Sequence, residues 1–170
     1  MISRIYVMPA RPVGGPKNGS HAKGRASTRA DSYLIDSKLS KKELIKLAEA
    51  LTNPILEKYS INKLAGLGSK WNYAIEISFL PGVTDNVGHT VKEMASDMFH
   101  LKNNSNLAVY SSKIFFVSDR MENTEKFSSN LYNPLIERAH IALIKNGKLN
   151  LPNKVPKVVL KKRKPVINVK

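Results

Sequence analysis

Three groups of residues carry side chains that could take part in catalysis or ligand binding. Residues 14–25 (GGPKNGSHAKGR) are rich in glycine and basic residues, which makes them the best candidate for a phosphate-binding loop. The second group is an acidic cluster of Asp85, Glu93 and Asp97, and the third is the four histidines. Cysteine is absent, so the chain has no thiol nucleophile, thiolate metal ligand or disulfide.

None of these groups has the spacing that its chemistry requires. Gly19 is followed by Ser20, where a phosphate loop has Gly-Lys-Ser or Gly-Lys-Thr, so this segment is interpreted as a solvated loop. The acidic cluster fits the solvated edge of a helix better than an acid–base pair. The histidines are too far apart for a metal site: His21, His89, His100 and His140. The sequence therefore predicts no catalytic residue, no cofactor site and no metal ligand.

The charge of the chain is high and unevenly placed. The 170 residues contain 28 Lys and Arg against 13 Asp and Glu, a net charge of +15. Residues 1–30 and 145–170 contain basic residues and no acid, so residues 31–144 are close to neutral. Both ends are therefore expected to lie at the periphery of the fold.

A basic tail raises the possibility of nucleic-acid binding. Lys161–Lys164 could neutralise phosphates and give a salt-dependent affinity. Apolar residues interrupt this basic run on both sides, and an exposed linker explains the charge equally well. Nucleic-acid binding is therefore the less favoured alternative.

Membrane and secretory segments are not expected. No apolar run approaches the roughly 20 residues of a membrane helix, and no apolar signal core follows Met1. With 42% apolar residues the chain has enough material for a packed core. We expect a soluble cytoplasmic protein with no membrane partner.

Apolar periodicity predicts the elements of the fold. Strands are expected at Arg4–Met8, Tyr33–Ile35, Leu56–Ile61, Tyr73–Phe79, Leu107–Val117 and Ile136–Ile144. Three helices are expected: from a capping box at Ser40–Glu43 to Asn53–Pro54, over Val87–Met98 after a cap at Thr84 or Asp85, and from a second capping box at Asp119–Glu122 through Leu131. Residues 9–30, rich in glycine and proline, are expected to form a loop.

The two halves of the chain contain a repeated segment. LTNPILEKYSI at 51–61 aligns with LYNPLIERAHI at 131–141, with leucine, asparagine, proline, glutamate and isoleucine shared at matching places. A common helix-ending motif written twice is one explanation. The other is a repeat of two β-α units that complete a common core, and the matching apolar stripes before both segments favour it.

The second half resembles a known family. A strand is followed by Pro81-Gly82-Val83, Asp85 and Gly88 before a helix, and the closing segment contains Asn133, Pro134 and Glu137. This arrangement is similar to PurS, the small subunit of phosphoribosylformylglycinamidine (FGAM) synthase, which in many organisms is the N-terminal domain of the large synthase chain. The match covers about 71–144, and residues 1–62 resemble a degenerate first copy.

The resemblance implies an α+β fold with two PurS-like units in tandem. Each unit would have an antiparallel sheet with helices packed on one face, and the pair would form an internal pseudo-dimer. The expected boundaries are 1–62 for the first unit, 63–70 for a connector, 71–145 for the second unit and 146–170 for a basic linker-like tail. The first copy lacks the glycines and aspartate of the motif, so its first helix is expected to be shortened or absent.

The resemblance also implies a function in purine biosynthesis. The chain would be an accessory subunit or N-terminal part of FGAM synthase that is not an enzyme on its own, and it would dock the catalytic chain and the glutaminase. As a pseudo-dimer it would be a monomer in solution. An inactive remnant of a split synthase gene is an alternative. The motif residues would have structural or partner-contact roles: Pro81, Gly82, Asp85, Gly88, Asn133, Pro134 and Glu137.

Overall fold

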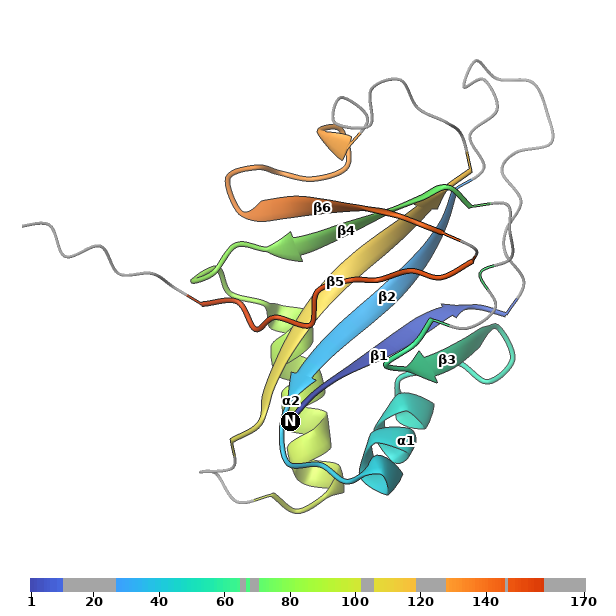
Figure 1. Ribbon diagram of the computed structural model, residues 1–170. Coiled ribbons are helices and arrows are strands. Elements are labelled where there is room, and N and C mark those ends of the chain that lie inside the picture. Colours follow the sequence, from blue (N-terminus) through green and yellow to red (C-terminus); the bar gives the residue numbers. More distant parts are fainter. Residues whose placement is uncertain are drawn as a thin grey trace, which may run out of the picture.

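The computed structural model describes residues 1–10, 27–64, 67, 71–101, 106–118, 128–145 and 147–157 (Figure 1). Its elements are β1 (Ile2–Pro9), β2 (Ser27–Asp36), α1 (Lys41–Ala50), β3 (Glu57–Ile61), β4 (Tyr73–Phe79), α2 (Asn86–Met98), β5 (Ala108–Val117) and β6 (Glu137–Leu143). The protein is α+β, because these strands form one six-stranded antiparallel sheet that carries the two helices.

The strand order is β3-β1-β2-β5-β4-β6. Strands from the first half of the chain form one side of the sheet, and strands from the second half form the other. Each half contributes three strands, and the first of them lies between the other two. Strand β1 pairs with β2 and β3, and β4 pairs with β5 and β6. The halves meet at β2 and β5, where Ser32 lies opposite Ser112. The two halves therefore contribute the same strand arrangement from opposite edges.

Helix α1 begins at the predicted capping box. The Ser40 hydroxyl accepts a hydrogen bond from the Glu43 amide at 3.3 Å, and the Glu43 carboxylate accepts one from the Ser40 amide at 2.7 Å. The Ser40 hydroxyl also donates to the Glu43 carboxylate at 2.7 Å, and this bond, followed by the bond from the Ser40 amide, lowers the pKa of Glu43. Leu44 and Leu47 form the apolar side of the helix, and both are buried in a core that includes residues of β1 and β2. The predicted start and apolar face of this helix are confirmed.

Helix α2 packs on the same face of the sheet as α1 (Figure 1). Asp85 caps its first turn, so of the two predicted caps the aspartate is correct and Thr84 is not. Both helices contribute to one core with residues of β1, β2 and β5: Ile5, Val7, Ile35, Leu44, Leu47, Ala48, Val91, Ala95 and Val109. No helix in the described ranges combines the length and apolar character needed to cross a bilayer.

The opposite face of the sheet is covered by extended segments. Along β1, Tyr6 and Met8 alternate with the residues that face the helices, so their side chains lie on this second face. They pack in a second core with residues from the segment before β4 and from the segment after β6: Leu64, Leu67, Trp71, Ile144, Leu149 and Leu151. Figure 1 shows the C-terminal segment crossing this face in front of β2 and β5.

The prediction that both ends of the chain are peripheral is wrong for the described parts. Strand β1 lies inside the sheet between β2 and β3. Leu151, within the expected linker-like tail, is buried in the second core. The physical reason is that the described helices cover only one face, so the apolar residues of extended segments must cover the other.

Strand β2 is longer than predicted, and the expected loop over 9–30 is wrong for Ser27–Ala30. The buried residues in the first part of this strand are Thr28, Ala30 and Ser32. Because these residues are small or polar, the sequence shows no alternation of apolar residues there. The predicted strand at Tyr73–Phe79 is confirmed with the same bounds. The segment 14–25, interpreted as a solvated loop, and most of the helix expected from Asp119 lie outside the described residues.

Candidate functional site

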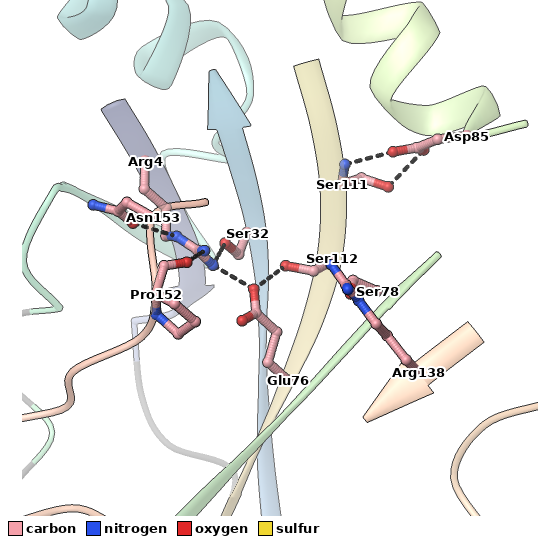
Figure 2. Close-up of polar contacts among 10 residues, drawn as sticks. All are labelled: Arg4, Ser32, Glu76, Ser78, Asp85, Ser111, Ser112, Arg138, Pro152 and Asn153. Carbon is pink, nitrogen blue, oxygen red and sulfur yellow. Dashed lines mark hydrogen bonds and ion pairs between the residues drawn. The ribbon is translucent and has the colours of Figure 1, made fainter. Parts of the chain in front are cut away.

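Asp85 fixes the first motif turn to the sheet. Its carboxylate accepts a hydrogen bond from the Gly88 amide at 2.7 Å. It also accepts bonds from both the amide and the hydroxyl of Ser111, at 2.5 and 2.7 Å (Figure 2). The pairing of β4 with β5 ends at Ser78 and Ser112. Asp85 therefore binds β5 at Ser111, one residue beyond the last pair of β4 and β5. One carboxylate thus both caps α2 and anchors it to β5.

The two motif glycines have distinct structural reasons. Gly82 has a φ of 93°, a conformation that favours glycine over other residues, and it lies in the turn after β4. Gly88 is buried where α2 approaches β5. A Cβ at this position would lie 2.7 Å from the carbonyl oxygen of Val109 and 2.6 Å from a carboxylate oxygen of Asp85. Gly88 thus permits close contact between the helix and the sheet.

The second part of the motif is a turn that occurs twice. Before β6, the Asn133 amide donates to the Glu137 carboxylate at 2.9 Å, and the Glu137 amide donates to the Asn133 carbonyl at 2.8 Å. Before β3, Asn53 and Glu57 make the same two bonds at the same distances. The sequence repeat therefore extends to backbone geometry, and in both copies the segment leads into an edge strand.

The structure brings all the predicted motif residues to one corner of the sheet. Phe79 at the end of β4 pairs with Glu137, and the Leu80 amide donates to the Ile136 carbonyl at 2.8 Å. The turn from Pro81 to Gly88 therefore adjoins the turn from Asn133 to Glu137. The first half has a matching corner, where the Ala10 amide donates to the Leu56 carbonyl at 2.8 Å.

Both corners expose large apolar side chains. In the Asn-Pro turns the residues after the proline are 84% and 66% exposed for Ile55 and Leu56, and 82% and 41% exposed for Leu135 and Ile136. Val87 at the start of α2 adds a further exposed side chain to the second corner. Matched apolar pairs on the surface are a feature of contact sites and have no role in the described core.

A buried ion pair joins the two halves across the second face. The Arg4 guanidinium donates to the Glu76 carboxylate, with side chains 3% and 9% exposed. The strands that carry them are separated by β2 and β5, so three strand spacings of about 4.8 Å lie between them. Ser32 and Ser112 lie in this gap, and their small side chains leave room for the two long ones (Figure 2).

The ion pair is part of a larger hydrogen-bond network. Arg4 donates to the Ser32 hydroxyl at 3.1 Å, and the Ser112 hydroxyl donates to Glu76 at 2.8 Å. Arg4 also donates to the Pro152 carbonyl at 3.0 Å and to the Asn153 side chain at 3.1 Å. One guanidinium thus holds the sheet and the C-terminal segment together.

The network also affects a neighbouring phenol. Tyr6 lies on the same face, with its ring centroid 5.9 Å from the Arg4 guanidinium. Burial raises the pKa of the Tyr6 hydroxyl, the positive charge of Arg4 opposes this shift, and the negative charge of Glu76 adds to it.

The amino-acid sequence alone does not predict this network. Arg4 lies in the basic end that was expected to be peripheral, and Glu76 lies in the expected strand Tyr73–Phe79, which carries no sign of a partner. A usable signal was present, because Glu76 is the one charged residue in YAIEISF, but it does not reveal the partner. The partner follows only from the register, in which Arg4 lies opposite Leu34 and Glu76 lies opposite Ile114.

A hollow lies beside the ion pair on the second face. It has a volume of about 240 Å³ and is lined by residues of β1, β2, β4, β5 and β6 and of the C-terminal segment. Its charged lining residues are Arg4, Glu76, Arg138 and Lys154, together with His140. Because Arg4 neutralises Glu76, the remaining cations make this hollow suited to an anion.

The other candidate residues do not assemble into a site. His89, His100 and His140 are exposed, and His21 lies outside the described residues. Asp85 is used in capping, whereas Glu93 and Asp97 are exposed on α2. Within the described ranges no group of three or more histidine, cysteine or acidic residues is placed to hold a metal ion.

Comparisons with known proteins identify no relative of this chain. No protein-family model, curated protein or solved structure matches the chain. The resemblance to PurS consequently depends on the motif residues alone.

Proposed function

We propose that this protein is a non-catalytic accessory part of FGAM synthase that docks the ATP-using catalytic chain and the glutaminase in de novo purine biosynthesis. The observation that carries the proposal is the pair of matched corners, each with an Asn-Pro turn, an edge strand and two exposed apolar residues. The proposal implies a cytoplasmic protein.

Under this proposal the chain consists of two PurS-like units that form an internal pseudo-dimer. The strand order supports this, because each half contributes its strands in the same arrangement from opposite edges. The register supports it as well. Ser32 and Ser112 pair at the centre, and Leu34 and Ile114, which lie opposite Arg4 and Glu76, occupy places with the same spacing from those serines.

The motif residues support docking indirectly. Asp85 and Gly88 hold α2 against β5, and Asn133 and Glu137 shape the turn before β6, so these residues fix the corner. The side chains free to meet a partner are the apolar residues that these turns present. Exposed apolar residues surrounded by polar ones are typical of protein–protein contacts.

The corners can be tested in binding to purified synthase chain and glutaminase. The Leu135→Ser/Ile136→Ser variant is expected to weaken the complex at least ~10-fold, because a few central apolar residues carry most of the energy of an interface. Ile55→Ser/Leu56→Ser tests the other corner. Affinity is measured by calorimetry or interferometry at moderate salt.

Leu143→Ser is the matched control, because Leu143 is an exposed apolar residue at the far end of β6. It is expected to change the affinity less than ~3-fold. Unchanged binding by both corner variants would contradict docking through the corners. Absence of any complex with the wild-type chain would favour a gene remnant, and tight salt-sensitive binding to RNA instead would favour a nucleic-acid-binding protein.

The pseudo-dimer predicts the oligomeric state. A single PurS-like unit would leave the central edge of β2 or β5 unpaired, whereas the two halves cover these edges for each other. Sedimentation equilibrium is therefore expected to give a monomer of 19.0 kDa at micromolar concentration. A stable dimer of the full chain would contradict the prediction that the pairing of β2 with β5 within one chain leaves no need for a second copy.

A further inference from the structure

The hollow on the second face has the composition of a ligand site. Its floor contains the Arg4–Glu76 pair and the hydroxyl-bearing residues Ser78 and Ser112. Two basic side chains reach it from different segments, Arg138 from β6 and Lys154 from the C-terminal segment. We propose that this hollow binds a small ligand that carries a phosphate group.

The charge balance favours an anion. In the described parts of the chain, Arg138 has one hydrogen bond, to the Ser78 hydroxyl at 3.3 Å, and neither Arg138 nor Lys154 forms a salt bridge with a carboxylate. The single carboxylate of the hollow, Glu76, already accepts bonds from Arg4 and Ser112. The hollow thus has two uncompensated positive charges on a concave surface, where the local potential is strongest.

The donors suit a phosphate group in particular. A guanidinium offers a planar pair of N–H donors that matches two phosphate oxygens, and an ammonium adds a point charge. Hydroxyls of Ser78 and Tyr110, both lining residues, supply neutral donors nearby.

The size of the hollow limits the ligand. Sites for drug-sized molecules occupy about 300–1,000 Å³, and this one has about 240 Å³. A smaller hollow of about 80 Å³ adjoins it at Tyr110 and Pro156 and extends toward the turn at Pro81 and Gly82. A phosphate monoester with a short organic part fits this space, whereas a folded partner does not enter it.

Binding would also fasten the C-terminal segment to the sheet. Lys154 follows Pro152 and Asn153, which Arg4 already holds, while Arg138 belongs to β6. A phosphate group that contacts both cations would therefore bridge the edge of the sheet and this segment. The ligand is expected to slow amide hydrogen exchange in residues 149–157 as well as in β6.

The test is a titration of the full chain with inorganic phosphate and with glycerol 3-phosphate, followed by calorimetry and by NMR shifts at low ionic strength. We expect saturable binding with sub-millimolar affinity for the ester and shifts centred on Arg138 and Lys154. Arg138→Gln is expected to weaken binding at least ~10-fold and Lys154→Gln at least ~3-fold, as loss of charge-assisted hydrogen bonds requires.

Lys58→Gln is the matched control. Lys58 occupies in the first Asn-Pro repeat the place that Arg138 occupies in the second, and it does not line the hollow. It is expected to change the affinity less than ~2-fold. An equal effect of all three substitutions would show attraction by net charge alone and overturn the site.

Two further outcomes would also overturn the proposal. One is non-saturable binding with shifts spread over the surface. The other is a single-stranded RNA that binds far more tightly than the ester and is weakened equally by Lys58→Gln. The site does not depend on the proposed partners, so loss of phosphate binding and loss of synthase binding are separate results.

Discussion

Replacing Glu76 with glutamine is expected to lower the free energy of unfolding by about 3–5 kcal/mol, because it leaves the buried Arg4 guanidinium without its counter-charge. Both side chains are almost fully buried, so solvent screens the remaining charge only weakly. The same loss is expected for Arg4→Met, which also releases the Pro152 carbonyl and the Asn153 side chain. Urea unfolding followed by the fluorescence of the single tryptophan measures both variants.

The exposed pair of Arg29 and Asp31 is the control for this prediction. Its side chains are 53% and 34% exposed, so Arg29→Gln is expected to cost less than about 1 kcal/mol. The Arg4→Met/Glu76→Leu double variant is expected to lose less than the sum of the two single losses, because no charge is then left buried. Additive losses in the double variant would contradict a coupled ion pair.

Gly88→Ala is expected to destabilise the protein by about 1–3 kcal/mol. Two effects oppose each other. Alanine stabilises a helix by about 1 kcal/mol relative to glycine. Its Cβ, however, would overlap the backbone carbonyl of Val109 and the capping carboxylate of Asp85. The overlap outweighs the propensity, because a strand carbonyl in the middle of the core cannot move away without shifting β5.

His89→Ala is the control, since His89 is the next residue of α2 and is exposed. It is expected to change stability by no more than about 0.5 kcal/mol. Thermal and urea unfolding measure both variants, and proton–nitrogen NMR locates the shifts. A Gly88→Ala variant as stable as the wild type would show that α2 lies further from β5 than described.

Several elements could be predicted because local signals determine them. The capping box at Ser40 and the alternation along Tyr73–Phe79 each need only neighbouring residues, and both are present as expected. Asp85 was one of the two expected caps of α2 for the same reason, and it is the residue that caps the helix. The repeat also gave the Asn-Pro turns, whose hydrogen bonds coincide in both halves.

The remaining features depend on contacts between distant parts of the chain. Arg4 meets Glu76 only because β2 and β5 place serines between them, and no local pattern contains this register. Leu151 lies among lysines and prolines, so its composition indicated a linker although it packs against the sheet. Among the described residues both helices pack on one face of the sheet, so the second face needs apolar residues from extended segments such as the one that contains Leu151.

The most direct test of the proposed function is a comparison of glutamine-dependent and ammonia-dependent turnover by the cognate synthase chain and glutaminase. If this protein docks the two for ammonia transfer, adding it should raise glutamine-dependent turnover at least ~10-fold and leave turnover with added ammonia nearly unchanged, because free ammonia bypasses the glutaminase. No change in either rate, with both partners active and present in excess, would contradict the proposal.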